Sequence, residues 1–333
     1  MGFDGPGKST PRSGRRQPVI SPQRSIAIRA GRLQTSAPMF ARYLMLFLGV
    51  FACSTSAIFI RMSTTNPFVL TAARLVIAGL FLAPVFWREK RRLPGAFTRR
   101  HLRRTHLPAA VLAAHLITWT LGARITAVAQ SSLIVNLVPI ALPFLLYWIA
   151  RERINRAELA GTALALAGLL TLSARDALTG GGSMAGNALC FVSMVLFALY
   201  VALARRNRDF GSVWLYVIPV YGQAALLCLL VSLPWLRGFA FGSAREWSLM
   251  VALAAIPTLC GHSLLNAALR GIRGQVVSLI NVSQFIFAAV MGYLLFGEAP
   301  RALFYAASAI VVAGVAIVVW AAPAESEDPG GGA

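Results

Sequence analysis

Residues 132–152, SLIVNLVPIALPFLLYWIARE, and residues 278–298, SLINVSQFIFAAVMGYLLFGE, decide the fold, because both are long apolar runs and they align without a gap. Internal sequence symmetry of this kind is a mark of duplicated membrane folds. We therefore interpret the chain as an internal duplication. A shift of 146 residues gives eleven identities, at Arg124, Ser132, Leu133, Ile134, Ile140, Tyr147, Glu152, Ala160, Ala163, Ala167 and Gly168.

The composition excludes a soluble fold. Hydrophobic residues make up 57% of the chain and charged residues only 13%, whereas a soluble domain carries about 25% charged residues. A membrane-spanning helix needs about 20 apolar residues. The sequence therefore predicts an all-α integral membrane protein with ten transmembrane helices, near residues 43–60, 68–87, 107–123, 128–149, 157–174, 184–204, 212–234, 247–268, 275–296 and 302–321.

The predicted organisation has two repeats between two tails. Residues 40–174 form the first five-helix repeat and residues 184–321 the second. Because five is odd, the second repeat enters the membrane upside down, and inverted repeats of this type place a substrate site at their interface. Residues 1–38 and 322–333 are expected to be disordered tails, the first of them basic, and Met39 offers an alternative start that would remove the first tail.

The positive charges predict the orientation. The net charge is +20, but the Lys and Arg residues lie in the first tail and in short loops. With the N-terminus inside, 24 of the 31 lie in inner segments and six in outer ones, leaving Arg74 within a span. This bias predicts a multi-pass protein of the cytoplasmic membrane with both termini cytoplasmic. No soluble domain remains to present a basic face, so nucleic-acid binding is not expected.

Three groups of short motifs stand out: Asn136-Leu-Val-Pro139 leading to Arg151-Glu-Arg153, Gly161 and Gly168; Leu295-Phe-Gly-Glu298 followed by Gly314; and Pro67 with Arg74. With these motifs the sequence resembles the EamA branch of the drug/metabolite transporter superfamily over about residues 40–321. The resemblance implies ten helices in two inverted halves around a central cavity, and the movement of small metabolites or drugs. One departure is Phe285, which stands where the family usually has a proline, so a kink there is in doubt.

Polar residues inside spans are costly and are therefore candidates for function. On each of four spans they recur at helical spacing, and the spans are corresponding pairs from the two halves. We expect them to line one cavity. They are His115, Trp119, Asn136, His262, Asn266, Asn281 and Gln284, and Arg74 in the second span is a further candidate substrate-binding residue.

Each candidate also has a structural interpretation. An Asn or Ser in a span often serves only as a contact between helices, and a lone His is often a packing residue. Arg74 could extend to the outer interface instead of contacting substrate. Glu152 and Glu298 are interpreted as residues at helix starts that complement the helix dipole.

These features favour secondary transport of a small polar, neutral or zwitterionic, amino-acid-like solute, with efflux the expected direction. No carboxylate is expected at mid-membrane, and no enzyme motif, catalytic residue, metal site or cofactor site is recognised. The alternatives are a passive channel and a lipid-modifying intramembrane enzyme. The expected partners are the substrate and the bilayer, and both a monomer and a homodimer fit.

Overall fold

The computed structural model describes residues 1–2, 39–126, 128–178, 183–236, 243–296 and 302–321. Apart from residues 1–2, the two predicted tails lie outside these ranges, as do the loop 237–242 and Glu298. Described residues 39–178 are called the first half below, and described residues 183–321 the second half.

The first half is entirely helical apart from its connections. Its elements follow the predicted apolar runs closely, although two of the runs are interrupted. They are α2 (Met39–Ser54), α3 (Ser56–Met62), α4 (Pro67–Arg92), α5 (Arg99–Ile125), α6 (Val128–Val135), α7 (Val138–Leu145), a π-helical turn (Leu146–Ala150) and α8 (Arg156–Leu178).

The second half has the same character. A long π-helical segment interrupts one run, and a single residue interrupts another. The elements are α9 (Met184–Arg206), α10 (Val213–Leu236), α11 (Ala244–Leu253), the π-helical segment (Ala254–His262), α12 (Ser263–Ala268), α13 (Gly274–Val282), α14 (Gln284–Phe296) and α15 (Ala302–Ala321).

Within the described ranges, eight helical segments are long and apolar enough to cross a membrane. The other two predicted spans are the interrupted run from Val128 to Ala150 and α8, whose crossing stays a prediction. The eight are Met39–Met62, Pro67–Arg92, Arg99–Ile125, Met184–Arg206, Val213–Leu236, Ala244–Ala268, Gly274–Leu295 and Ala302–Trp320.

The basic loop expected over 88–106 is mostly helix. Helix α4 continues to Arg92 and α5 already begins at Arg99, so only residues 93–98 connect them. Charged residues end an apolar run but do not end a helix, because Arg and Lys are good helix formers.

Helix α4 begins directly after a capping residue. Asn66 accepts a hydrogen bond from the Phe68 amide at 3.0 Å, and Pro67 occupies the first helical position.

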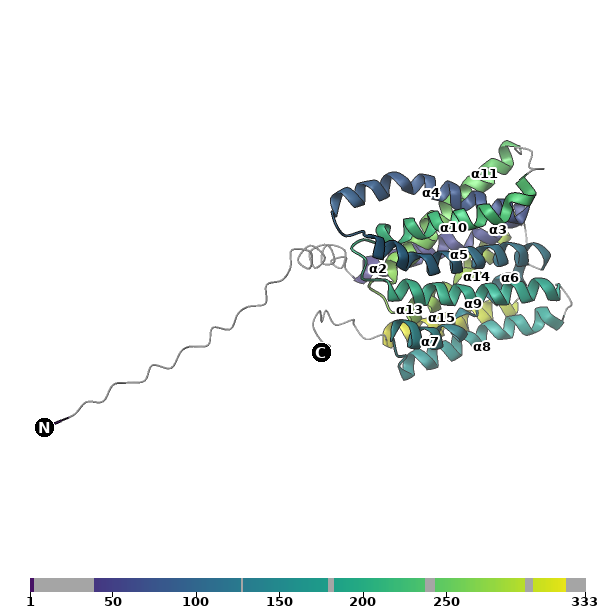
Figure 1. The fold of residues 1–333 in the computed structure, drawn as a ribbon. Coiled ribbons are helices and arrows are strands. Elements are labelled where there is room, and N and C mark those ends of the chain that lie inside the picture. Colours follow the sequence, from purple (N-terminus) through teal and green to yellow (C-terminus); the bar gives the residue numbers. More distant parts are fainter. Residues whose placement is uncertain (3–38, 127, 179–182, 237–242, 297–301, 322–333) are drawn as a thin grey trace.

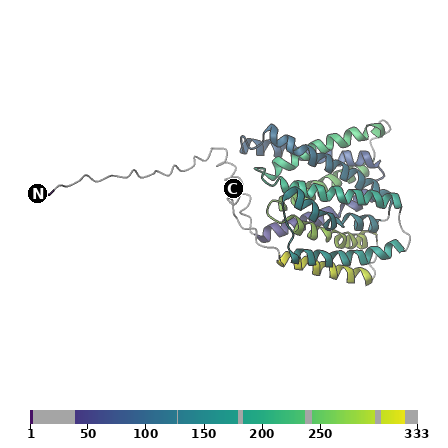
Figure 2. The same ribbon diagram turned by 60° about the horizontal axis from the view of Figure 1, so that its bottom comes forward.

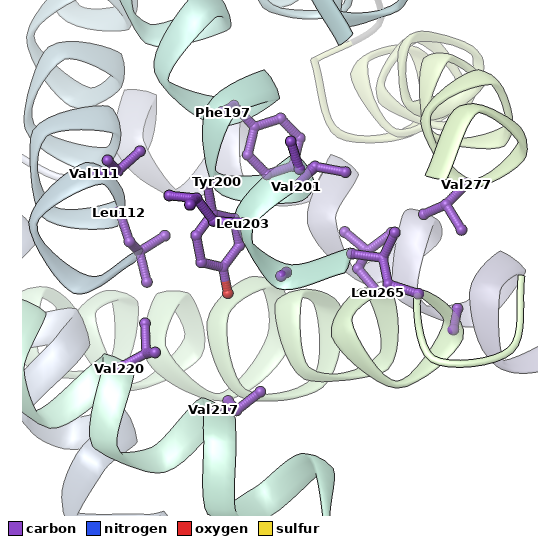
Figure 3. Packing of buried hydrophobic residues seen from close by; sticks show 14 of the residues in the cluster. Val111, Leu112, Phe197, Tyr200, Val201, Leu203, Val217, Val220, Leu265 and Val277 are labelled. Carbon is purple, nitrogen blue, oxygen red and sulfur yellow. The ribbon is translucent and has the colours of Figure 1, made fainter. Parts of the chain in front are cut away.

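The helices form one bundle in which α2 begins and α15 ends at the same end (Figures 1 and 2). That end is called the terminus end below, and the opposite one the distal end. Helices α4 and α10 pack along each other, as do α5 and α9. Figure 3 shows apolar side chains of α5, α9, α10, α12 and α13 meeting in the core, among them Leu112, Tyr200 and Val217.

Helices α8 and α15 pack closely against each other through two glycines of α8. A Cβ atom added at Gly161 would lie 2.6 Å from the carbonyl oxygen of Gly314, and one added at Gly168 would lie 2.9 Å from that of Ala307. Small residues allow such contact between helices in lipid, where packing replaces the hydrophobic effect as the source of association.

Candidate functional site

A small cavity of about 50 Å³ lies inside the bundle, between elements of both halves. The side chains around it come from α2 to α6, α9, the π-helical segment, α13 and α14. Its volume has room for a few water molecules and is well below the roughly 300 Å³ of a typical ligand pocket. The lining residues are Cys53, Ser56, Arg74, His115, Leu116, Trp119, Val135, Asn136, Phe197, Pro257, His262, Asn281 and Gln284.

The structure brings the predicted site residues together. Seven of the eight line this cavity: Arg74, His115, Trp119, Asn136, His262, Asn281 and Gln284. The eighth, Asn266, lines a smaller neighbouring pocket of about 10 Å³ that shares His262 and Asn281 with the cavity. The expectation of one cavity between symmetry-matched spans therefore matches the geometry, while a role in binding substrate stays a prediction.

Four spans depart from regular α-helix beside the cavity. In three of them a backbone amide donates to the carbonyl three residues earlier instead of four. These amides belong to Thr55, Leu137 and Ser283, with N···O distances of 3.3, 3.1 and 3.0 Å. The π-helical segment from Ala254 to His262 is the fourth departure. Such interruptions are common at functional sites, because they redirect side chains and release backbone groups.

Proline explains only part of these interruptions. Pro139 lacks an amide hydrogen and follows the break at Asn136 and Leu137, and Pro257 lies in the π-helical segment. Phe285 replaces the proline usual in the family, yet α13 ends at Val282 and α14 begins at Gln284. The break that was in doubt therefore exists without a proline, next to two cavity residues.

The two histidines face each other across the cavity. The ring centroids of His115 and His262 are 6.4 Å apart. His115 is held through its Nδ1, which lies 2.8 Å from the Ser193 hydroxyl, and its ring stacks on Phe197 at 4.8 Å. His262 has a buried Nδ1 without a hydrogen-bond partner. One histidine is thus fixed and the other has a free polar group at the cavity.

Arg74 does not extend to the membrane interface. Its side chain is buried, with 1% of the residue exposed. Its Nε donates to the Thr258 hydroxyl at 2.9 Å, and its Nη1 has no hydrogen-bond partner. The interpretation of Arg74 as an interfacial residue is therefore wrong, because neighbouring helices cover it completely.

The amide side chains are partly engaged with the protein itself. Asn136 donates to the Ser132 carbonyl at 2.7 Å, and Gln284 donates to the Asn281 side chain. Asn266 donates to the Tyr200 hydroxyl at 2.7 Å, which makes it a contact between α12 and α9. The structural interpretation therefore has direct support for Asn266, although its Oδ1 is buried without a hydrogen-bond partner.

Sequence reasoning did not select Ser56, Cys53 or Phe197, which also line the cavity. The Ser56 hydroxyl is buried without a hydrogen-bond partner. A usable pattern was present, because the polar run Cys53-Ser-Thr-Ser56 interrupts an otherwise apolar segment. Phe197 offered no such pattern, since a phenylalanine in a span is ordinary.

Ion pairs join the two halves at the terminus end. Arg205 of α9 donates to Glu152 at 2.7 Å, and the Gly274 amide at the start of α13 donates to the same carboxylate at 3.0 Å. Arg273 pairs with Glu158 at 2.7 Å. The helix that follows Glu152 begins only at Arg156, so Glu152 does not lie at the start of that helix as the sequence predicted. Its carboxylate complements α13 of the other half instead.

A more exposed pair lies at the same end. Arg104 of α5 binds Asp209, in the turn between α9 and α10, at 2.7 Å. Partial burial raises the pKa of the Asp209 carboxyl, but hydrogen bonds from Arg104 outweigh this and hold the pKa below its usual value. This pair also links the two halves.

At the distal end, the carboxylate of Glu246 joins the second half to the first. Glu246 of α11 accepts hydrogen bonds from the hydroxyls of Ser63 and Thr65, at 2.7 and 2.9 Å, and from the Thr64 amide. These three residues follow α3 of the first half. Contacts between the halves therefore bridge the bundle on both sides of the cavity.

The family model for the EamA-like transporter family matches the chain twice, over residues 41–174 and 184–320. The protein belongs to the EamA-like transporter family. This EamA-like protein is a multi-pass membrane protein of the transporter type, since the family match covers the eight helical segments that are long and apolar enough to cross a membrane. The two matched segments agree with the predicted duplication.

The fold of this EamA-like transporter is similar to that of solved structures, of which 29 chains match. One, described as the crystal structure of a protein, has a TM-score of 0.69 and 18% sequence identity, and the match covers 86% of this chain and 99% of that one. At that identity the likeness concerns the fold alone. No curated protein matches the sequence.

Metal-binding groups do not gather in the part of this transporter that the structure describes: no three His, Cys, Asp or Glu residues are placed to hold an ion.

Proposed function

We propose that this protein is a secondary transporter that moves a small polar metabolite across the cytoplasmic membrane by alternating access. The observation that carries the proposal is the polar cavity between the two halves, with bridging contacts toward both ends of the bundle. A cavity too small for substrate, between two bridged ends, fits a closed conformer. Opening one end at a time would enlarge it and admit solute from one side.

We infer that the architecture is ten spans in two inverted five-helix repeats. The packing of the helices supports this. When each span is replaced by the corresponding span of the other half, an observed contact between two helices becomes another observed contact. Helices α5 and α9 pack together, and so do their counterparts, the segment from α11 to α12 and helix α2.

The contact between α8 and α15 gives a second line of support. The 146-residue shift carries Gly161 onto Ala307 and Gly168 onto Gly314. The two close approaches, Gly161 with Gly314 and Gly168 with Ala307, are therefore exchanged by the repeat. A two-fold axis between these helices would produce this pattern.

The proposed orientation places the terminus end in the cytoplasm. The charge bias of 24 to six supports it. The proposed solute is neutral or zwitterionic and amino-acid-like, because amide, imidazole and indole groups line the cavity, and the proposed direction is efflux. A passive channel fits less well, since contacts bridge both ends. A lipid-modifying enzyme would need clustered acids at membrane depth.

The test is transport by purified protein in proteoliposomes, first with a panel of radiolabelled amino acids and then with variants. Saturable flux that is stimulated by substrate on the opposite side supports a carrier. Non-saturable flux without such exchange would identify a channel.

Two cavity variants, Asn281→Ala and Trp119→Ala, should lower transport several-fold at normal expression, because each hydrogen bond to substrate contributes about 0.5–1.5 kcal/mol. The matched controls lie away from the cavity. The Ser232 hydroxyl bonds within α10, and Trp235 stacks on Phe68. Ser232→Ala and Trp235→Ala should keep wild-type flux per folded molecule. Lower yield with normal flux in the cavity variants would mean that these residues serve only in packing.

A further inference from the structure

Arg74 is a permanently charged side chain buried beside the cavity without a carboxylate partner. No ion pair joins it to any acidic residue in the described ranges, and its exposed fraction is 1%. The ionisable groups that interact with it electrostatically are the thiols of Cys53 and Cys228, the hydroxyl of Tyr221 and the imidazoles of His115 and His262. None of these groups carries a negative charge at neutral pH.

A buried charge without a counter-ion is unfavourable and is usually paired. The guanidinium donates from Nε to the Thr258 hydroxyl, and its Nη1 has no hydrogen-bond partner. Packing does not need a guanidinium here, since an apolar side chain would fill the same place without the cost of burying a charge. The missing partner therefore points to something that enters the cavity.

The surroundings fit an anion. No acidic residue lines the cavity. Besides Nη1 of Arg74, two other buried polar groups of lining residues have no partner: the Ser56 hydroxyl and Nδ1 of His262. A hydroxyl can donate to an anionic oxygen, and so can an imidazole nitrogen that carries a proton. Three potential donors and one fixed positive charge therefore border the same small space.

We propose that the transported solute carries a carboxylate and that Arg74 binds it, with Ser56 and His262 as additional donors. This proposal rests on the proposed transport function and names its substrate class. A planar carboxylate offers two acceptor oxygens to the guanidinium. One fixed cation balances a monoanion but not a phosphate dianion, and it repels cationic solutes. A zwitterionic amino acid supplies the one negative charge that Arg74 needs through its carboxylate.

The test measures thermal unfolding of the full-length purified protein against three matched panels: the amino acids, their carboxamides and the corresponding decarboxylated amines. We expect at least one amino acid to raise the Tm in a saturable way, while its carboxamide and amine do not. In Arg74→Gln the apparent Kd of that amino acid should increase at least about tenfold, because a charge-assisted hydrogen bond is lost. Arg74→Lys should retain part of the affinity.

The unliganded variants separate binding from structure. Arg74→Gln should have a Tm equal to or above that of wild type, since it removes a buried charge that has no counter-ion. Arg124 is the matched control, because it is a half-buried helical arginine that donates to the Thr65 carbonyl, outside the cavity. Arg124→Gln should keep the wild-type affinity for the amino acid.

Three results would overturn the proposal. One is a panel in which no carboxylate raises the Tm. Another is equal stabilisation by an amino acid and its carboxamide, and the last is an unchanged Kd in Arg74→Gln. Saturable, exchange-stimulated flux of a solute without a carboxylate would leave the transport function standing while it removes this substrate class.

Discussion

Replacing Glu152 by glutamine is expected to open the bundle at its terminus end. The Glu152 carboxylate accepts from Arg205 at 2.7 Å and from the Gly274 amide at 3.0 Å, and Arg273 lies at 3.8 Å. Arg205 is 5% exposed and Glu152 11%, so water screens the pair only slightly. All three partners belong to the second half, which would have to move away for this end to open.

The size of the effect follows from burial. Removing one partner of a buried ion pair costs about 3–5 kcal/mol, because the other charge stays buried. Glutamine keeps one acceptor oxygen for the Gly274 amide, so we expect a smaller loss of about 2–3 kcal/mol. That loss corresponds to a shift of roughly 30- to 150-fold toward the conformer open at this end. Asp209→Asn breaks a pair whose carboxylate is 60% exposed, and an exposed pair contributes at most about 1 kcal/mol.

The assay follows a cysteine that lies behind Glu152. Ser278 is 3% exposed and lines the smaller pocket, on α13 between Gly274 and Asn281. In a cysteine-free background, Ser278→Cys is labelled with an impermeant maleimide applied from one side of the vesicle at a time. Glu152→Gln should accelerate labelling from the terminus side about 30-fold or more, and Asp209→Asn less than about fivefold.

Three outcomes would refute this reasoning. Equal labelling rates in Glu152→Gln and Asp209→Asn would show that the buried pair does not hold this end closed. Faster labelling from the distal side would show that the pair stabilises a different conformer. A lower Tm with unchanged labelling would assign Glu152 to folding stability alone.

Three further predictions concern packing, orientation and coupling. Gly161→Ala should destabilise the fold by about 1–3 kcal/mol in thermal unfolding, because its Cβ would lie 2.6 Å from the opposing carbonyl, whereas Gly222→Ala, with nothing within 4 Å, should be neutral or stabilising. Ser183→Cys should react with an impermeant reagent in intact cells, and labelling only after permeabilisation would reverse the proposed orientation. If transport is driven by a proton gradient, the double variant His115→Gln and His262→Gln should abolish pH-driven accumulation, since histidine is the residue type lining the cavity whose unperturbed pKa lies nearest to neutral pH. Full retention would remove both residues from the coupling mechanism.

The helices were predictable because a membrane span is specified locally. A run of apolar residues predicts a helix wherever it occurs, since a backbone in lipid must satisfy its own hydrogen bonds. The predicted runs therefore coincide with the observed helices to within a few residues, except where basic residues extend α4 and α5. Helical spacing and the duplication also predicted which polar side chains meet, because six of the seven residues chosen on that ground line the cavity.

Contacts between distant residues needed the tertiary structure. From the sequence Glu152 was expected at the start of its own following helix, but that helix begins at Arg156, and the partners Arg205 and Gly274 lie in the other half of the chain. The break at Ser283 could not be foreseen, because no proline marks it.

Arg74 shows most clearly what the sequence determines and what only the tertiary structure decides. The sequence determined that a charged residue lies within an apolar span, and it left an interfacial and a buried position equally open. Only the packing of the surrounding helices decided that this side chain is buried beside the cavity, with Nη1 free. The physical reason is that hydropathy depends on the residue itself, whereas burial and charge compensation depend on which neighbours the fold brings around it.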